Sequence, residues 1–350
     1  MAVASVLIVS AQRNEFVITG KIIDQSTQQP LAGASVFCQN TTVGTVSKND
    51  GEFSLRLPNG GYDLIVSYTG FETYSMRINN DNAAAPITIE LKKQDKTMQE
   101  VAVVGSTEVA DGWSKYGQFF IENFIGTTPN AALCSIENPD ALRFFYSKKR
   151  NRLKVLTKTD VIVNNKALGY KIKYQLDSFT YEYGNGISTL TGFPLFEEML
   201  GSDQEKTVWK TNREKAYYGS RMHFMRSWYD STLLDEGYAI QKVEDLKALD
   251  GKEIENPFDT TFYRADTSDV EIDLKGRLKV IFRNETPDPK YLTFYKLPSY
   301  MMVQISAIDL ADGFIIEENG YFYDQSDVIN TGYWAWEKFA EALPYDYWPE

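Results

Sequence analysis

Short segments of alternating apolar and polar residues, separated by turn residues, fill the first 93 positions of the chain. In 51–57, Phe53, Leu55 and Leu57 stand at every second position. This period of two is typical of a strand with one buried face. Further segments of this kind, bounded by Gly, Pro, Asn or Asp, lie at 16–23, 34–37, 62–68 and 87–91. Strands this short and closely spaced predict a small β-sandwich over residues 14–93.

The chain is long enough for a second folded unit. Its 350 residues exceed the ~100–200 of a usual domain, so we expect an α+β domain at 112–350 after a polar linker at 94–111. The 22 Tyr and 20 Phe residues favour sheet surfaces, where rings pack across strands. The expected fold class is therefore mainly β, or α+β, with a largely antiparallel sheet in the second domain.

Periodic patterns predict the elements of this second domain. Aromatic residues at helical spacing predict a helix near 116–124, and the strongest helical pattern covers 212–233, where Thr211 and Glu214 have capping-box spacing. A hairpin is expected around Lys275-Gly276, and a closing helix at 332–343. Further strands are expected at 142–147, 153–158, 170–176, 270–275, 277–285, 301–308 and 313–323.

The first eleven residues form an apolar run that ends in Val9-Ser10-Ala11. Its small residues fit a signal-peptidase site, so we interpret 1–11 as the end of a truncated signal peptide whose start lies upstream. The alternative is a frayed apolar N-terminus. We expect an exported protein of the periplasm or outer membrane, peripheral to the membrane at most, because no later stretch reaches 18 apolar residues.

A series of residues within 14–93 resembles a known family. The series is Gly20, Asp24, Pro30-Leu31, Gly33-Ala34, Val36, Gly44-Thr45, Asp50-Gly51, Phe53, Gly61-Tyr62, Ser67-Tyr68 and Gly70-Phe71. In this order the residues resemble the carboxypeptidase-regulatory-like domain, which implies a seven-stranded, prealbumin-like β-sandwich. The module precedes the plug of many TonB-dependent outer-membrane transporters, and 98–105 is similar to the segment that follows it there. The chain beyond Gly105 is shorter than a plug and barrel, and the module is an accessory in peptidases. We therefore expect neither activity.

A second resemblance covers scattered positions of the other domain. The positions are Arg150-Asn151-Arg152, Asn212-Arg213, 217–220, His223-Phe224 and 332–334. Together they are similar to a Gram-negative envelope protein family of unknown function that carries the module in front. This resemblance implies a location and no chemistry.

The charge of the chain argues against a polyanionic partner. The net charge is −12 and the pI about 4.8, so nucleic acid would be repelled over most of the surface. The longest basic cluster, at 148–152, lies between two apolar runs. We interpret it as the solvated tip of a hairpin.

The scarcity of nucleophiles and metal ligands predicts a protein without catalytic, metal-binding or cofactor-binding residues. His223 is the single histidine of the chain, and no carboxylate stands three residues after it, so a zinc peptidase motif is absent from the sequence. Cys38 and Cys134 are isolated, and sequence spacing leaves open whether they pair, although free thiols are expected. Acidic pairs such as Glu197-Glu198 and Glu317-Glu318 carry no meaning without their geometry.

The helix expected at 212–233 supplies the candidate ligand-binding residues. Several donors lie there beside aromatic side chains, the mixture that ligand pockets use. They are Asn212, Arg213, Tyr217, Ser220, His223 and Arg226. The alternative is an internal polar network that ties the helix to the sheet.

Three functions follow from these patterns. The first is a non-catalytic binding or scaffold protein of the cell envelope, with an envelope protein or a glycan as partner. The second is a carboxylate-based glycan hydrolase, which requires two carboxyls ~5–10 Å apart in a cleft. The third is an accessory component of a TonB-dependent nutrient uptake system. The oligomeric state stays open, and a carbohydrate-binding role for the sandwich rests on analogy of fold.

Overall fold

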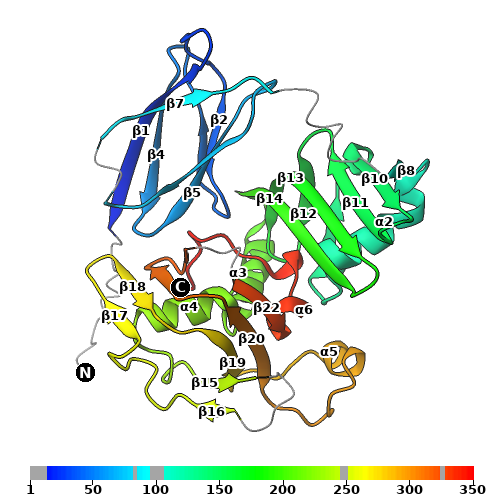
Figure 1. Ribbon diagram of the computed structural model, residues 1–350, viewed down its shortest axis with the longest axis vertical. Coiled ribbons are helices and arrows are strands. Elements are labelled where there is room, and N and C mark those ends of the chain that lie inside the picture. Colours follow the sequence, from blue (N-terminus) through cyan, green and yellow to red (C-terminus); the bar gives the residue numbers. More distant parts are fainter. Residues whose placement is uncertain (1–13, 82–84, 95–105, 245–250, 324–327) are drawn as a thin grey trace, which may run out of the picture.

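The computed structural model describes residues 14–81, 85–94, 106–244, 251–323 and 328–350. Three β-rich bodies follow one another along the chain and meet around the C-terminal segment (Figure 1). The signal peptide proposed at 1–11 lies outside the described residues, as does 95–105 of the proposed linker. No helix in the described ranges is both long and apolar enough to cross a membrane.

The first body is the seven-stranded sandwich that the sequence predicts. One sheet has the order β4-β1-β7 and the other β3-β2-β5-β6. The strands are β1 (Glu15–Asp24), β2 (Ser35–Cys38), β3 (Gly44–Val46), β4 (Glu52–Pro58), β5 (Tyr62–Ser67), β6 (Tyr74–Ile78) and β7 (Ile87–Leu91). The sequence patterns missed β3 and β6, because these edge strands are mostly exposed and so lack the apolar alternation of the others.

The core of the sandwich is closed by residues from the other end of the chain. Strands β1, β4 and β5 contribute buried side chains such as Ile18, Leu55 and Leu64. Tyr321 and Tyr345 pack into the same cluster. The core of the sandwich is therefore completed by side chains from the C-terminal part of the chain.

The second body is a seven-stranded antiparallel sheet backed by a helix. The strand order is β8-β10-β11-β13-β12-β9, with β14 paired to β13. The strands are β8 (Thr107–Glu108), β9 (Cys134–Ile136), β10 (Leu142–Ser147), β11 (Arg152–Thr157), β12 (Val161–Asn165), β13 (Tyr170–Glu182) and β14 (Ile187–Glu198). The expected aromatic helix is present as α2 (Gly112–Phe124), whose Phe120 and Phe124 are buried. The basic cluster at 148–152 spans the β10–β11 turn, as predicted.

The third body holds a second hydrophobic core within the region expected to form one α+β domain. Its five-stranded sheet has the order β16-β15-β19-β20-β22, and a three-stranded sheet has the order β17-β18-β21. The strands are β15 (Tyr238–Val243), β16 (Lys252–Glu253), β17 (Tyr263–Ala265), β18 (Asp269–Ile272), β19 (Gly276–Phe282), β20 (Gln304–Leu310), β21 (Phe314–Glu317) and β22 (Val328–Gly332). The short helix α5 (Pro289–Phe294) connects β19 to β20.

The helix predicted at 212–233 is wrong as a single element. Two helices occupy this region, α3 (Asp203–Tyr217) and α4 (Arg221–Tyr229). The break falls at Gly219, whose φ of 81° is left-handed, and the Ser220 side chain caps α4. The capping box of α3 is formed by Ser202 and Glu205, not by the predicted pair nine residues later.

Two further predictions fail for reasons of tertiary pairing. Strand β18 pairs with β17 and β21, whereas β19 pairs with β15 and β20, so no hairpin surrounds Lys275-Gly276. The closing helix is limited to α6 (Tyr333–Trp336) and a 3₁₀ turn at Phe339–Glu341. Within this turn the Ala340 amide donates to the Ile125 carbonyl oxygen, and the Ala340 carbonyl oxygen accepts from Asn165 Nδ2, so tertiary hydrogen bonds replace helical ones.

Candidate functional site

Arg213, one of the predicted ligand-binding residues, is held by hydrogen bonds to other parts of the protein. Its Nε donates to the Leu168 carbonyl oxygen at 2.6 Å. Its two terminal nitrogens bond both carboxylate oxygens of Glu198, at 2.9 and 2.7 Å. The guanidinium also lies 3.9 Å from the centroid of the Tyr170 ring. Arg213 therefore fixes α3 to the seven-stranded sheet.

Two more of the predicted residues, Asn212 and Tyr217, also contact other parts of the protein. Asn212 Nδ2 donates to the carbonyl oxygen of Ala167 at 2.8 Å. Tyr217 is buried at the end of α3, with its ring centroid 5.0 Å from that of His223 and 5.4 Å from Arg226 Cζ. Both side chains therefore join elements of the protein to one another.

His223 is buried and both its ring nitrogens have partners. Nδ1 accepts from the Gly219 amide at 3.2 Å and lies 2.9 Å from the Tyr238 hydroxyl. Because a backbone amide can only donate, the ring proton belongs on Nε2, which faces Glu236 Oε2 at 3.2 Å. Burial lowers the pKa of His223 to about 4, against the opposing effect of Glu236. Ser220 accepts from the His223 amide as the N-cap of α4.

Arg226 is deeply buried and forms three hydrogen bonds within the protein. Its side chain is 1% exposed, and its guanidinium donates to the carbonyl oxygens of Asn319, Tyr347 and Tyr345, each at 2.9 Å. The Trp348 ring lies 3.5 Å from its Cζ. Arg226 therefore holds the C-terminal segment against α4. The six predicted residues do lie together, and the contacts they make are those of the internal network that the sequence left as the alternative.

The acidic pairs named from the sequence do not converge. Glu197 and Glu198 are neighbours on β14 and so point to opposite faces of the sheet. Glu197 pairs with Lys173 at 2.5 Å, and Glu198 with the arginine of α3. Glu317 accepts a hydrogen bond from the Tyr323 hydroxyl, and burial raises its pKa. Glu197 and Glu198 both line an open hollow at the end of β14, but each carboxylate there is already paired with a cation.

The two cysteines are free. Cys38 lies in the sandwich core, where burial raises the pKa of its thiol far above the usual value. Burial also raises the pKa of Cys134 to about 12. Because the thiolate is the reactive form, neither cysteine is activated as a nucleophile.

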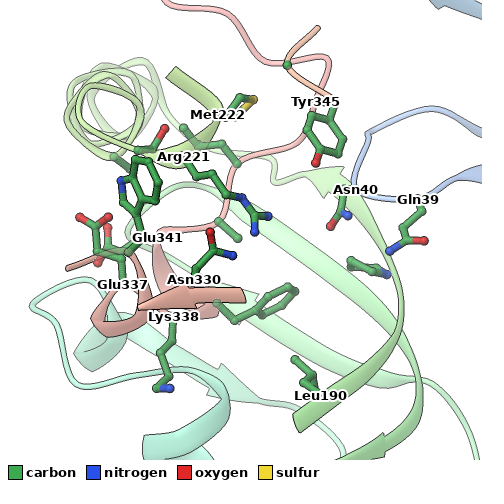
Figure 2. Close-up of a pocket in the computed structure, with 18 of the residues that line it drawn as sticks. Gln39, Asn40, Leu190, Arg221, Met222, Asn330, Glu337, Lys338, Glu341 and Tyr345 are labelled. Atoms are coloured by element: carbon green, nitrogen blue, oxygen red, sulfur yellow. The ribbon is translucent and has the colours of Figure 1, made fainter. Parts of the chain in front are cut away.

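A cavity of about 440 Å³ lies where the three bodies meet. The sandwich contributes Gln39 and Asn40, strands β13 and β14 contribute Tyr174 and Leu190, and helix α4 begins at its edge. The C-terminal segment closes another side (Figure 2). Of the six predicted residues only Ser220 lines this cavity. The break between α3 and α4 turns the first residues of α4 toward it.

Arg221 enters this cavity without a polar partner. Figure 2 shows its guanidinium reaching toward the centre, beside Asn330 of β22. Within the described part of the chain, Arg221 makes no hydrogen bond or ion pair, and its Cζ lies 5.1 Å from the centroid of the Phe322 ring. Asn330 Oδ1 is buried and likewise accepts no hydrogen bond from any described residue. These donors and acceptors have no hydrogen-bonding partner in the part of the chain that the structure describes.

Two carboxyls line the opposite side of the cavity. Glu337 and Glu341 lie side by side in Figure 2, and Lys338 extends away from them. Burial raises the pKa of Glu337 well above its usual value, and the charge of Glu341 adds to this. Burial raises the pKa of Glu341 as well, although Thr128 and Asn130 both donate to its carboxylate. Glu337 has no such donor among the described residues.

Sequence reasoning missed these residues because their exposure to the cavity depends on breaks in two predicted helices. Glu337 leaves helical geometry with a ψ of 95°, which turns it away from the face it would share with Ala340 and Leu343. The available signal was proximity in sequence: Arg221 directly follows the candidate Ser220, and Glu337 lies three residues after the 332–334 motif.

A family comparison describes the sandwich. The family model of the CarboxypepD_reg-like domain matches residues 18–103, which carry the seven strands and the expected order of glycines and aromatics. Residues 18–103 form a CarboxypepD_reg-like domain. This domain is shared with two curated receptors. The chain is 31% identical over 88 residues to the TonB-dependent receptor SusC of Bacteroides thetaiotaomicron, covering 25% of this chain and 8% of the receptor.

The second receptor extends the match beyond the CarboxypepD_reg-like domain. It is the TonB-dependent receptor P39 of Formosa agariphila, 28% identical over 126 residues, which are 36% of this chain and 11% of the receptor. The chain thus spans a small part of these relatives. Among solved structures, a DUF3823 family protein from Bacteroides ovatus aligns over 54% of this chain and 83% of its own, at 11% identity and a TM-score of 0.19. That score is too low to support an argument.

Proposed function

We propose that this chain is a non-catalytic binding protein of the cell envelope, and that its ligand site is the cavity between the three bodies. The observation that supports this is the set of polar side chains in the cavity that have no hydrogen-bonding partner among the described residues. In a buried location, unpaired polar groups cost free energy, so natural proteins keep them where a ligand uses them. Ligand pockets have this size and this mixture of apolar and polar lining.

The proposal of a non-catalytic role rests on how the reactive groups are held. The single imidazole has both nitrogens engaged and a depressed pKa, and desolvation raises the pKa of both thiols, which keeps them protonated. In the described ranges, no three side chains of His, Cys, Asp or Glu are placed to hold a metal ion. Activation of water or of a nucleophile by these groups would require their release from the core.

The proposed location rests on the CarboxypepD_reg-like domain. Both curated relatives that share it are named TonB-dependent receptors. We propose that this chain is exported and works at the outer membrane or in the periplasm, beside a TonB-dependent uptake system, where it presents or receives a small polar ligand.

A cavity-blocking variant tests the site. Leu190 is 37% exposed at the cavity wall, whereas Ile187, on the same strand, is 56% exposed and does not line it. A panel of sugars, sugar acids, amino acids and polyols is screened by saturation-transfer NMR against the wild type. We expect at least one saturable ligand, lost in Leu190→Trp and retained in Ile187→Trp. A panel without any binder, or equal binding by both variants, would overturn the proposal.

A glycan hydrolase is the second candidate, and the carboxyls of Glu337 and Glu341 favour it. Both line one cavity, and Glu341 alone has two hydrogen-bond donors that favour its charged form. Glycosidases separate an acid from a carboxylate in this way. The same NMR samples are followed for new reducing ends over several days. Turnover that stops in Glu337→Gln would establish the hydrolase and exclude the non-catalytic proposal.

A further inference from the structure

We propose that the cavity binds a small hydroxylated monocarboxylate of the uronic-acid class, with its carboxylate on Arg221 and its hydroxyl groups on Asn330, Gln39 and Asn40. This inference rests on the proposed function, because it names the ligand of the same site.

The carboxylate follows from the state of Arg221. Its guanidinium lies in the cavity and no carboxylate of the described chain pairs with it. The other arginine of α4, Arg226, shows what the fold does with a guanidinium that it uses structurally, since three carbonyl oxygens bind it. A guanidinium presents a planar fork of donors that matches two carboxylate oxygens. Arg221 therefore fits an anion that comes from outside the chain.

The hydroxyl groups follow from the amides around this guanidinium. Asn330 Oδ1 is a buried acceptor without a donor in the described ranges. Gln39 and Asn40 reach the cavity from the sandwich, and neither side chain forms a hydrogen bond with a described residue. An amide both donates and accepts, so it pairs with a hydroxyl in either orientation. Several amides around one cavity thus suit a polyol better than an aliphatic acid.

The single negative charge follows from the acidic side of the cavity. Glu337 and Glu341 line the same space, and a negative charge on one carboxyl makes a second negative charge nearby less favourable. A dianionic phosphate would meet this repulsion twice, and Arg221 is the single arginine among the lining residues. One carboxylate is therefore the anion that this cavity accommodates best. Its volume lies in the lower part of the ~300–1,000 Å³ range of ligand pockets, which suits a sugar acid rather than a polymer.

The experiment compares three matched ligands by isothermal titration calorimetry on the full chain. D-glucuronate carries the carboxylate, D-glucose lacks it, and D-glucose 6-phosphate replaces it with a dianion. We expect D-glucuronate to bind at least about tenfold more tightly than either of the others, because a charge-assisted bidentate pair is worth about 1.4 kcal/mol or more.

Two substitutions assign this selectivity to residues. Arg221→Met removes the charge, and Arg221→Lys keeps the charge but not the fork. Both are expected to bring D-glucuronate to within about threefold of D-glucose, whereas Arg150→Met on the exposed β10–β11 turn leaves the ratio unchanged. Asn330→Asp, which keeps the shape and adds a negative charge, is expected to weaken D-glucuronate at least about tenfold and D-glucose less. Melting temperatures confirm that each variant folds.

The outcomes separate this inference from the proposed function. Equal affinity for D-glucuronate and D-glucose, or selectivity that survives Arg221→Met, would overturn the acidic ligand class but leave the cavity as the site if Leu190→Trp still blocks binding. Binding of other panel members without any of the three sugars would reject the class in the same way. A chain that binds nothing in either experiment would reject both.

Discussion

Helix α4 carries two arginines, five positions apart, whose surroundings are opposite. Arg226 is 1% exposed and donates to three carbonyl oxygens of the chain, whereas Arg221 reaches into a cavity and pairs with no described carboxylate. Both were equally visible in the sequence, yet only Arg226 was selected as a candidate. The difference teaches that a concentration of donors and rings on a helix marks structure as readily as function. The informative sign is a polar group that the fold has left unused.

The strongest test of this contrast is Arg226→Met. Removal of the guanidinium leaves the carbonyl oxygens of Asn319, Tyr345 and Tyr347 buried without donors, and loss of one partner from a buried charged network costs about 3–5 kcal/mol. We expect the free energy of unfolding, measured by urea denaturation, to fall by this amount. A loss below about 1 kcal/mol would show that Arg226 is not structural, and the distinction between the two arginines would fail.

The next test uses the pH dependence of His223→Gln. Burial lowers the pKa of His223 to about 4, below the ~6.5 of an unfolded chain, so the unfolded state binds a proton first as the pH falls. The stability contributed by neutral His223 is therefore complete above pH 6.5 and is lost toward pH 4. Glu236 and Arg226 face the ring with opposite charges, and both remain in the variant.

As the pH falls, we expect the free energy of unfolding to decrease more in the wild type than in His223→Gln. From pH 7 to pH 4 the wild type should lose about 2–3 kcal/mol more than His223→Gln, measured by urea denaturation at each pH. Parallel curves would mean that the ring titrates as in solvent and that His223 is available for chemistry. That result would return His223 to the list of functional candidates.

The fold was more predictable from the sequence than the site. Strands such as β4 and β13 could be recognised because every second side chain is buried on one face, and the CarboxypepD_reg-like domain has turn glycines in a fixed order. Strand partners were not predictable, as the wrong hairpin at Lys275-Gly276 shows, because β18 and β19 are equally apolar and pair in different sheets. The site depends on Gly219 and on tertiary hydrogen bonds of Ala340. Gly219-Ser220 is a local stop-and-cap signal that the helical periodicity around it hid, whereas the hydrogen bonds of Ala340 have no local signal.

A smaller loss of stability is expected when the hydrogen bonds between the sandwich and the C-terminal segment are removed beside the cavity. The Thr42 amide donates to Asp346 Oδ1 at 2.9 Å, and its hydroxyl donates to the other carboxylate oxygen. The neighbouring Tyr345 amide donates to the Asn40 carbonyl at 2.6 Å. Asp346→Ala leaves the Thr42 amide unpaired, so we expect a loss of about 1–2 kcal/mol by urea denaturation.

The matched control for this wall is Asp50→Ala, a carboxylate on an exposed turn of the same sandwich. It should cost less than half as much. Because Asn40 lies next to the hydrogen bonds between Thr42 and Asp346, Asp346→Ala should also weaken a cavity ligand, and the control should not. Unchanged affinity in Asp346→Ala would remove the sandwich from the proposed site.

The smallest expected change in stability is that of Arg221→Met, and it carries the comparison furthest. Because the guanidinium pairs with no described residue, its removal should alter the free energy of unfolding by no more than about 0.5 kcal/mol, or raise it slightly. The apolar Met side chain can replace the contact of the guanidinium with the Phe322 ring. Melting curves with and without ligand then separate the two roles: the ligand-induced rise seen in the wild type should vanish, while the apo curve stays in place. A large loss of stability in the ligand-free protein would show that Arg221 serves the fold as Arg226 does. A side chain that serves only a ligand can be removed without destabilising the ligand-free protein.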